Sequence, residues 1–292
     1  EKRFQEGRFG GERSLLGWNV KMGDIACTIT QEGTHKNFAF FPVYEGEISV
    51  PLLEIWNRTM HAYPEQFTPF IMASGNDGDP DGFPTVDAQT LNQMLSVYPG
   101  LFEGYGEIGL YERENGGSPA LPPDSPRLQE IYPIIKKNNL VVYFHLGDGD
   151  KDNFEKVLKA NPEINFILHG DQLIYCGTCA KNLDDIEDIL SNYPNAYYGV
   201  DAFWGEDMDL FHLFVGNDKQ AYLGTFDRKF DSVLNYEVRK WKGFIERHPN
   251  QVLWGIDRGD AVWNYDVDVG LMQVKFARAF IGELDAAVQE KI

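Results

Sequence analysis

The sequence predicts an α/β protein with a (β/α)8 barrel fold whose first strand lies upstream of Glu1. Three observations support this prediction. A proline-containing phrase recurs where helix-like segments give way to apolar ones, strands and helices alternate, and the long irregular segments follow strands rather than helices. This alternation is typical of parallel βα units. In (β/α)8 barrels, the long loops that carry the active site follow the carboxyl ends of the strands.

The recurring phrase places a proline directly after a helix-like segment. It reads YPEQFTPFI from Tyr63, YPGLFEGYG from Tyr98, NPEINFIL from Asn161, YPNAYYGV from Tyr193 and HPNQVLWGI from His248. Proline cannot continue a helix, and it biases the preceding residue toward an extended conformation. Each phrase therefore indicates a helix end followed by a strand.

The individual elements follow from this period. We expect helices over Ser14–Met22, Leu52–His61, Asp87–Val97, Pro126–Asn138, Asn153–Ala160, Leu183–Asn192, Tyr236–Arg247 and Val269–Leu284. We expect strands over Ile25–Thr30, Thr68–Ala73, Gly104–Leu110, Leu140–His145, Asn165–His169, Ala196–Asp201 and Val252–Asp257. Because this order begins with a helix and is one strand short, a closed barrel requires a first strand before Glu1.

Four long segments without periodicity follow the expected strands two, three, four and seven. They are Gln31–Val50, Ser74–Val86, Glu112–Ser125 and Ala202–Leu234. All would lie on the side of a barrel that carries active sites. The segment after strand seven, with Trp204, is a candidate lid or specificity wall, and a surface elaboration or subunit contact is an equal alternative.

Composition limits the partners of the chain. The 292 residues carry a formal net charge of -19, which repels nucleic acid and anionic lipid surfaces. No apolar run reaches the roughly 20 residues that span a bilayer, and no signal segment opens the chain. We therefore expect one soluble domain over residues 1–292 that acts on a small molecule. The sequence does not determine whether the chain forms a homo-oligomer. It is equally compatible with a cytoplasmic location and with export after removal of an N-terminal segment.

The cysteines give little information. Cys27 is isolated, whereas Cys176 and Cys179 form one C-x-x-C pair in the sequence YCGTC. Such a pair can be redox-active or half of a zinc site, but no second pair completes one. We favour an inert or incidentally bridged loop pair, and the compartment stays undetermined.

Side chains that can bind a divalent metal end four of the expected strands. They are Glu107 in GYGEIGLYER, His145 in VVYFHLGDG, His169 in NFILHGD and Asp257 in VLWGIDRGD. Carboxylate and imidazole together suit zinc, manganese or iron. Each residue also has a structural interpretation. The histidines can be polar strand caps, Asp257 can pair with Arg258, and Glu107 can pair with a nearby arginine.

This ordered set resembles the amidohydrolase superfamily of metal-dependent hydrolases, and the likeness covers nearly the whole chain. The resemblance implies that His145 and His169 are metal ligands and that Asp257 is the base that contacts the metal-activated water. Glu107 would be a further ligand, which bridges two metals in some branches of the superfamily. The resemblance therefore leaves open whether the chain binds one metal ion or two. Zinc is the expected metal, with manganese or iron as alternatives.

Further roles are position-based predictions. We expect substrate contacts from three residues at or just after the ends of strands seven and eight: Trp204, Arg258 and Asp201. Of the remaining histidines, His61 and His248 are expected to be structural, and His212 belongs to the candidate lid. His35 follows strand two and could face the site, but we favour a solvated loop position. The superfamily's His-x-His pair at the end of strand one is absent from this sequence. Either it lies with the strand upstream of Glu1, which we favour, or the chain is a metal-poor relative.

The function implied by the resemblance is metal-dependent hydrolysis of a small-molecule ester, lactone, amide or phosphoester. A metal-dependent decarboxylase of the same superfamily is the nearest alternative. A catalytically inactive barrel that serves as a binding protein is the alternative from a different class. The irregular segments contain no readable motif that selects among substrates.

Overall fold

The structure is a computed structural model that describes residues 22–44, 51–74, 83–111, 120–147, 149–170, 183–200, 207–215, 218–255 and 266–292. These residues form two compact units. The sheet unit is Lys36–Gly199, and the terminal unit combines Glu1–His35 with Val200–Ile292. The expectation of a single domain stays a prediction.

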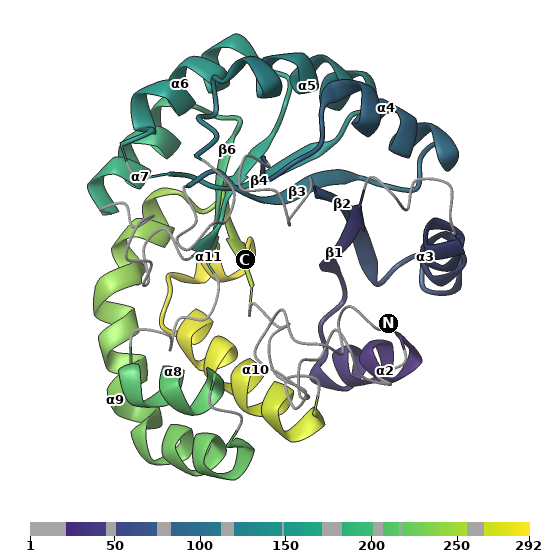
Figure 1. Ribbon diagram of the computed structural model, residues 1–292. Coiled ribbons are helices and arrows are strands. Elements are labelled where there is room, and N and C mark those ends of the chain that lie inside the picture. The colour runs from purple at the N-terminus through teal and green to yellow at the C-terminus, as the bar shows by residue number, and fades with distance from the viewer. Residues whose placement is uncertain are drawn as a thin grey trace. The chain divides into compact units, whose positions relative to one another are not determined.

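The sheet unit alternates strands and helices throughout. Its elements are β1 (Asn37–Tyr44), α3 (Pro51–Ala62), β2 (Phe67–Ser74), α4 (Ala88–Val97), β3 (Gly104–Gly109), α5 (Pro126–Lys137), β4 (Val141–His145), α6 (Lys151–Ala160), β5 (Phe166–Leu168), α7 (Leu183–Asn192) and β6 (Ala196–Val200). The pairs from β1 to β6 are parallel. The strands follow sequence order, which continues to β7 (Val252–Trp254). Helices α3 to α7 lie along one face of the sheet (Figure 1).

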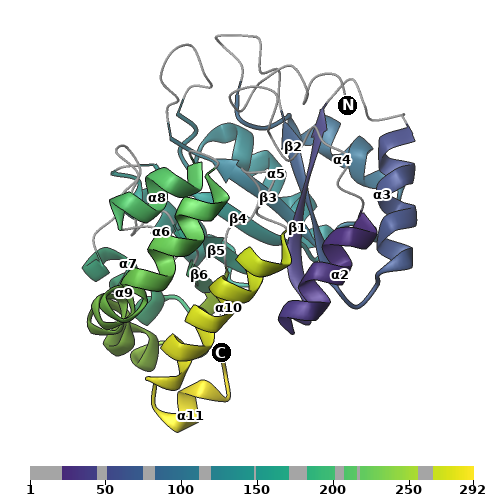
Figure 2. The same ribbon diagram turned by 90° about the horizontal axis from the view of Figure 1, so that it is seen from below.

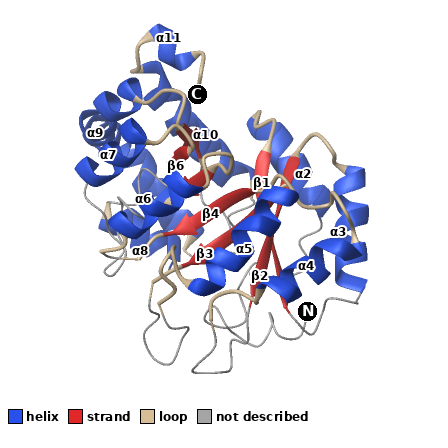
Figure 3. Ribbon diagram, turned by 90° about the horizontal axis from the view of Figure 1, so that it is seen from above, coloured by secondary structure: helices blue, strands red, loops and turns tan. Residues whose placement is uncertain are grey.

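Large apolar side chains fill the space between the sheet and these helices. Phe144 of β4 and Phe166 of β5 are fully buried. The Phe166 ring lies 5.8 Å from that of Tyr132 in α5 and 5.7 Å from that of Phe154 in α6. Strands covered by helices must be apolar along most of their length, because little of either face stays in water. Figure 3 shows this alternation of strands and covering helices in the sheet unit.

A second aromatic cluster occupies the other face of the sheet. The ring of Phe40 lies 5.1 Å from the rings of both Phe70 and Tyr143, and that of Phe38 lies 4.9 Å from Phe70. Gly104 leaves room for this cluster, since a Cβ atom there would lie 2.2 Å from the Phe70 ring. The cluster therefore supports Tyr143, which lies two residues before His145.

The terminal unit is mostly helical. It contains α2 (Met22–Glu32), α8 (Met208–Val215), α9 (Lys219–Arg247), β7, α10 (Val267–Gly282) and α11 (Ala286–Gln289). Helix α10 packs against α2 and α9, and α8 packs against α9 (Figure 2). The rings of Phe226 in α9 and Phe276 in α10 lie 5.4 Å apart. The N–H of Gly255, after β7, donates to the carbonyl of Val200 at 2.8 Å.

The strand expected over Ile25–Thr30, counted as strand two of the barrel, is wrong, because these residues belong to helix α2. Their β-branched side chains favour a strand locally. However, Ala26 and Ile29 are both buried and lie three residues apart, which is the spacing of one helix face. Gly33 then ends the helix with a φ of +76°. Packing of this face against α10 outweighs the local strand preference.

The strand at this position is instead β1, within the segment Gln31–Val50 that we expected to be irregular. Its proline, Pro42, weakens a strand prediction because proline has no N–H to donate. Proline is tolerated at a sheet edge, and among the described strands β1 is hydrogen-bonded only to β2. The edge position therefore explains why this proline-containing segment is extended.

The segment Ala202–Leu234 is also corrected, because its described part is mainly helical. It contains α8 and the first half of α9, so the expected helix Tyr236–Arg247 is only the second half of a longer one. Tyr222, placed in the candidate lid, is fully buried, with its ring 5.6 Å from that of Phe226. Trp204 lies outside the described residues.

The other described elements confirm the predicted βα order from α3 to α10. Helix Ser14–Met22 lies outside the described residues except for Met22, which begins α2. Within the described ranges, no helix is both long and apolar enough to cross a bilayer.

Candidate metal centre

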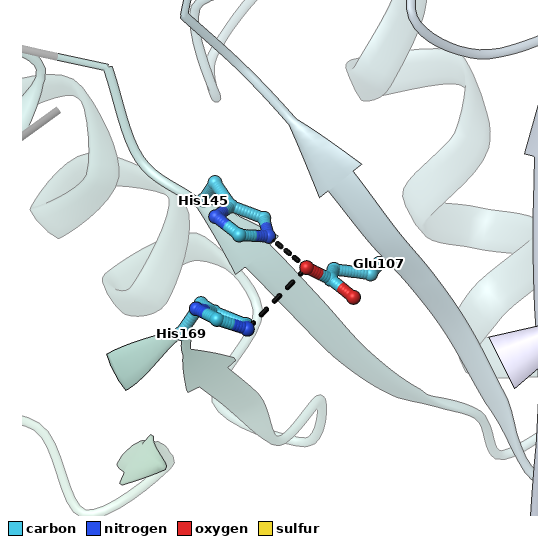
Figure 4. A group of neighbouring side chains, drawn as sticks. All are labelled: Glu107, His145 and His169. Carbon is cyan, nitrogen blue, oxygen red and sulfur yellow. Dashed lines mark hydrogen bonds and ion pairs between the residues drawn. The ribbon is translucent and has the colours of Figure 1, made fainter. Parts of the chain in front are cut away.

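Three of the predicted metal ligands lie together at the carboxyl ends of adjacent strands. Glu107 is on β3, His145 is the last residue of β4, and His169 directly follows β5. These strands are neighbours in a parallel sheet, so their carboxyl ends share one edge. Figure 4 shows the Glu107 carboxylate directed at both imidazole rings.

The donor atoms converge on one point. Nε2 of His145 contacts Oε1 of Glu107, and Nε2 of His169 lies 3.4 Å from the same oxygen. The two imidazole rings are stacked, with centroids 4.0 Å apart and an interplanar angle of 21°. Stacking turns both Nε2 atoms to the same side, where the carboxylate lies.

A register shift in β3 brings Glu107 to this side of the sheet. Tyr105 pairs with Val142 and Ile108 pairs with Phe144, so β3 uses one residue more than β4 between these pairs. Paired residues of parallel strands share a face, and both pairs lie on the helix-covered face. In a regular strand Glu107 would share that face with Tyr105, because side chains alternate. The extra residue of this β-bulge instead places Glu107 beside His145.

Gly106 is the residue that permits the bulge. Its φ is +125°, and a Cβ atom there would lie 2.3 Å from the carbonyl oxygen of Tyr143. A side chain at this position would therefore meet the β4 main chain and a backbone conformation that L-residues rarely adopt. The small residue before Glu107 is a structural requirement of the centre.

The strand before the bulge is fixed by a buried hydrogen-bond chain. The Tyr105 hydroxyl donates to Oγ1 of Thr85 at 2.7 Å, and the Thr85 hydroxyl donates to the carbonyl of Ala73 at 2.9 Å. Complete burial raises the pKa of Tyr105 well above its usual range, so the phenol remains a neutral donor. This chain ties β3 to the end of β2 two residues before Glu107.

The two histidines are held by main-chain bonds and by aromatic rings. Leu110 donates its N–H to the carbonyl of His145 at 2.8 Å, and His169 donates its N–H to the carbonyl of Phe144 at 3.0 Å. The ring of Tyr111 is edge-on to His145 at 6.0 Å, and that of Tyr143 is edge-on to His169 at 5.6 Å. The imidazoles are thus confined on several sides.

The donor set fits a divalent metal ion. One ligand atom from each of Glu107, His145 and His169 lies within 4.8 Å of the others. Ligands at about 2.1 Å from a tetrahedral zinc are separated by roughly 3.4 Å, and the His169–Glu107 pair is 3.4 Å apart. The histidine side chains are 11% and 7% exposed, whereas that of Glu107 is 25% exposed. Two imidazoles and one carboxylate with an open side form the ligand set of a catalytic zinc site or a non-haem iron site.

The other predicted functional residues lie outside the described part of the chain. These are the expected base Asp257 and the expected substrate contacts Trp204, Arg258 and Asp201. Cys176 and Cys179 also lie outside it. The structure therefore brings together three of the four predicted metal ligands and leaves the role of Asp257 a prediction.

The remaining histidines belong to helices or helix caps, or precede β1. His61 ends α3, with Nδ1 2.7 Å from the carbonyl of Asn57, and His248 caps the carboxyl end of α9. His212 is exposed on α8. His35 is exposed before β1 rather than after a strand, so its expected place in the loop after strand two is wrong.

Sequence reasoning did not single out two residues that contact the main chain around the centre. Gly106 could have been found from the G-x-G sequence around Tyr105, since glycine inside a strand often marks a bulge. Tyr198 of β6 donates its hydroxyl to the carbonyl of Gly170, next to His169, at 2.6 Å. No local sequence signal relates residues so far apart along the chain.

The fold is shared with solved enzyme structures. An amidohydrolase from Burkholderia multivorans with bound zinc has a TM-score of 0.52 at 10% identity, covering 95% of this chain and 86% of the other. The chain shares the barrel fold of this amidohydrolase. A protein from Pseudomonas putida, assigned as a 2-pyrone-4,6-dicarboxylic acid hydrolase, has a TM-score of 0.53 at 12% identity, with 95% and 86% covered. The fold expected from the resemblance to the amidohydrolase superfamily is confirmed.

A third structure extends the comparison to another reaction. The 2,6-dihydroxybenzoate decarboxylase from Rhizobium has a TM-score of 0.50 at 12% identity, and the likeness covers 96% of this chain and 86% of the other. No family model matches the sequence, and no curated protein matches it. At these identities, the comparisons establish the fold and leave the reaction to the site.

Proposed function

We propose that this chain is an enzyme, a metal-dependent hydrolase of a small-molecule ester, lactone, amide or phosphoester. The observation that carries the proposal is the convergence of Glu107, His145 and His169 on one point at the active-site end of a barrel sheet. The shared fold with the zinc-containing amidohydrolase supports it. Zinc is the proposed ion, held one per chain by these residues, with manganese or iron as alternatives.

Each described residue has a distinct part in this proposal. His145 and His169 donate ring nitrogens from a nearly buried position, which limits competition from water on that side. Glu107 supplies negative charge, which balances part of the charge of a divalent ion. A bound metal supplies Lewis acidity and lowers the pKa of water, which favours hydrolysis at neutral pH. Asp257 as the base and Asp201, Trp204 and Arg258 as substrate contacts complete the proposal.

The first experiment measures metal binding by the chelator-treated full chain. We expect one equivalent of zinc to bind, and we expect His145→Ala, His169→Ala and Glu107→Gln each to weaken zinc binding by more than about 100-fold. This exceeds the 10–100-fold loss typical of changes outside the ligand shell. The matched control is His61→Ala, because His61 is an exposed histidine at the end of α3.

Several outcomes would contradict the proposal. If the wild-type chain binds no stoichiometric zinc, manganese or iron, the metal centre is rejected. If His145→Ala binds zinc as tightly as His61→Ala does, His145 is not a ligand. If the metal-loaded chain shows no turnover across ester, lactone, amide and phosphoester panels, the hydrolase assignment fails even though the metal centre stands.

A decarboxylase is the second candidate, and the shared fold with the Rhizobium decarboxylase supports it. The same three ligands would serve either reaction, so product analysis must separate them. We would incubate the zinc-loaded chain with 2-pyrone-4,6-dicarboxylate and with 2,6-dihydroxybenzoate. Ring opening of the first supports the hydrolase, whereas CO2 release from the second supports the decarboxylase. If the chain binds either compound but takes up no metal and turns over neither of them, the inactive barrel is supported.

A further inference from the structure

The position of His169 depends on contacts beyond the end of its strand. β5 contains only Phe166–Leu168, so it ends one residue before this histidine. On the β4 side, the His169 N–H donates to the carbonyl of Phe144 at 3.0 Å. On the β6 side, the carbonyl of Gly170 accepts a hydrogen bond from the Tyr198 hydroxyl at 2.6 Å. The chain at His169 is thus tied to both neighbouring strands.

The bond from Tyr198 spans the gap left by the short strand. In the sheet register, Tyr198 pairs with Leu168, two residues before Gly170. Two residues of a strand rise by about 6.6 Å, which is comparable to the length of a tyrosine side chain. Tyr198 is fully buried, so its hydroxyl has little access to water as an alternative partner. Loss of this hydroxyl would remove a buried donor from the Gly170 carbonyl.

We infer that Tyr198 is a positioning residue of the metal centre, acting through the Gly170 carbonyl on the imidazole of His169. The inference rests on the proposed function for its consequence in metal binding. The tie to Phe144 is made by the main chain and resists substitution, whereas the Tyr198 tie depends on a single side-chain oxygen. Tyr198→Phe therefore removes the tie to the Gly170 carbonyl while keeping the ring, its packing and all three ligands.

The chain offers a matched control in Tyr132 of α5. Its side chain is also buried, and its hydroxyl donates to a backbone carbonyl, that of Pro123, at 2.5 Å. Tyr132→Phe removes the same kind of bond from the connection before α5, away from the ligand backbone. The two substitutions should therefore have similar effects on thermal unfolding and different effects on the centre.

The first readout is metal binding by the full-length wild type, Tyr198→Phe and Tyr132→Phe. Zinc affinity is measured by competition with a chromophoric chelator, and ligand geometry by the visible absorption bands of bound cobalt(II). We expect Tyr198→Phe to weaken zinc binding about 10-fold, in the range seen for residues that orient ligands, and to shift the cobalt bands. Tyr132→Phe should stay within about twofold of the wild type. Equal affinities and spectra for the two variants overturn the inference.

The second readout separates this inference from the proposed function. The chain has 6 histidines, so the ring signals of the metal-free protein can be resolved by aromatic 1H–13C NMR and assigned with His169→Ala. Tyr198→Phe should shift the His169 ring signal, and Tyr132→Phe should leave it in place. Wild-type protein that binds no metal rejects the proposed function, whereas an unmoved His169 signal in Tyr198→Phe rejects the inference.

Discussion

Replacing Asn195 with alanine should destabilise the sheet unit at the junction of β5 and β6. The Asn195 side chain is almost fully buried, and its Nδ2 lies 3.2, 3.1 and 3.1 Å from the carbonyls of Leu158, Asn161 and Ile164. The amide has two N–H groups, so it satisfies at most two of these carbonyls at once. Each buried carbonyl that loses its donor costs about 1–3 kcal/mol. With two carbonyls orphaned, the expected loss for Asn195→Ala is therefore about 2–6 kcal/mol.

Urea unfolding followed by circular dichroism measures this loss, and hydrogen exchange locates it. Peptides that cover residues 158–168 and 195–200 should exchange faster in Asn195→Ala. The control is Asn192→Ala, which removes an exposed amide that donates to the Asp188 carbonyl at 2.9 Å. That substitution should change the free energy of unfolding by less than about 0.5 kcal/mol. Equal losses in the two variants, or no local change in exchange, would refute the reasoning.

Two further predictions concern an acid-dependent helix cap and the bulge. Asp87 accepts the N–H of Thr90 at 2.7 Å, and this hydrogen bond lowers the pKa of Asp87 below 3.8. Its stabilising contribution is thus complete above pH 3.8 and is lost as the pH falls through the lowered pKa. Urea titrations from pH 7 to 2 should show that the free energy of unfolding falls less steeply with acid in Asp87→Asn than in the wild type. Asp87→Ala should lower the free energy of unfolding by about 1 kcal/mol at pH 7. Identical pH profiles for Asp87→Asn and the wild type would contradict the cap. Gly106→Ala should lower stability by about 1–3 kcal/mol more than Gly100→Ala, because both glycines have positive φ but only Gly106 meets the Tyr143 carbonyl. It should also weaken zinc binding, and equal losses in the two variants would reject the steric argument.

The predictable part of the fold is the part that local chemistry determines. Proline after a helix, as at Pro162 and Pro194, marks where the chain passes from the helix into β5 and β6, because proline has no N–H to continue the helical hydrogen bonds. His145 and His169 were found because a polar residue that ends an apolar strand lies where the carboxyl end of that strand leaves the core. Both features depend on a few neighbouring residues.

The errors arose where contacts between distant segments decide the structure. Ile25–Thr30 has strand-like residues but belongs to helix α2, which packs against α10 and buries Ala26 and Ile29. Helix α9 is longer than expected because its polar first half buries Tyr222 and Phe226, whose spacing was overlooked. The sequence also predicted Glu107 as a ligand. It did not show that, with regular alternation of side chains along β3, Glu107 would lie on the helix-covered face of the sheet. Only the pairing of β3 with β4 reveals the extra residue.

The extra residue in β3 has an evolutionary consequence. The third donor depends on the number of residues between Tyr105 and Ile108, as well as on the presence of Glu107. Deleting a single codon there would restore ordinary pleating and turn the carboxylate away from the two histidines with no ligand replaced. Related genes that differ by such an indel would encode proteins with different metal chemistry despite identical ligand residues, and length variation at this point would be more informative than sequence identity.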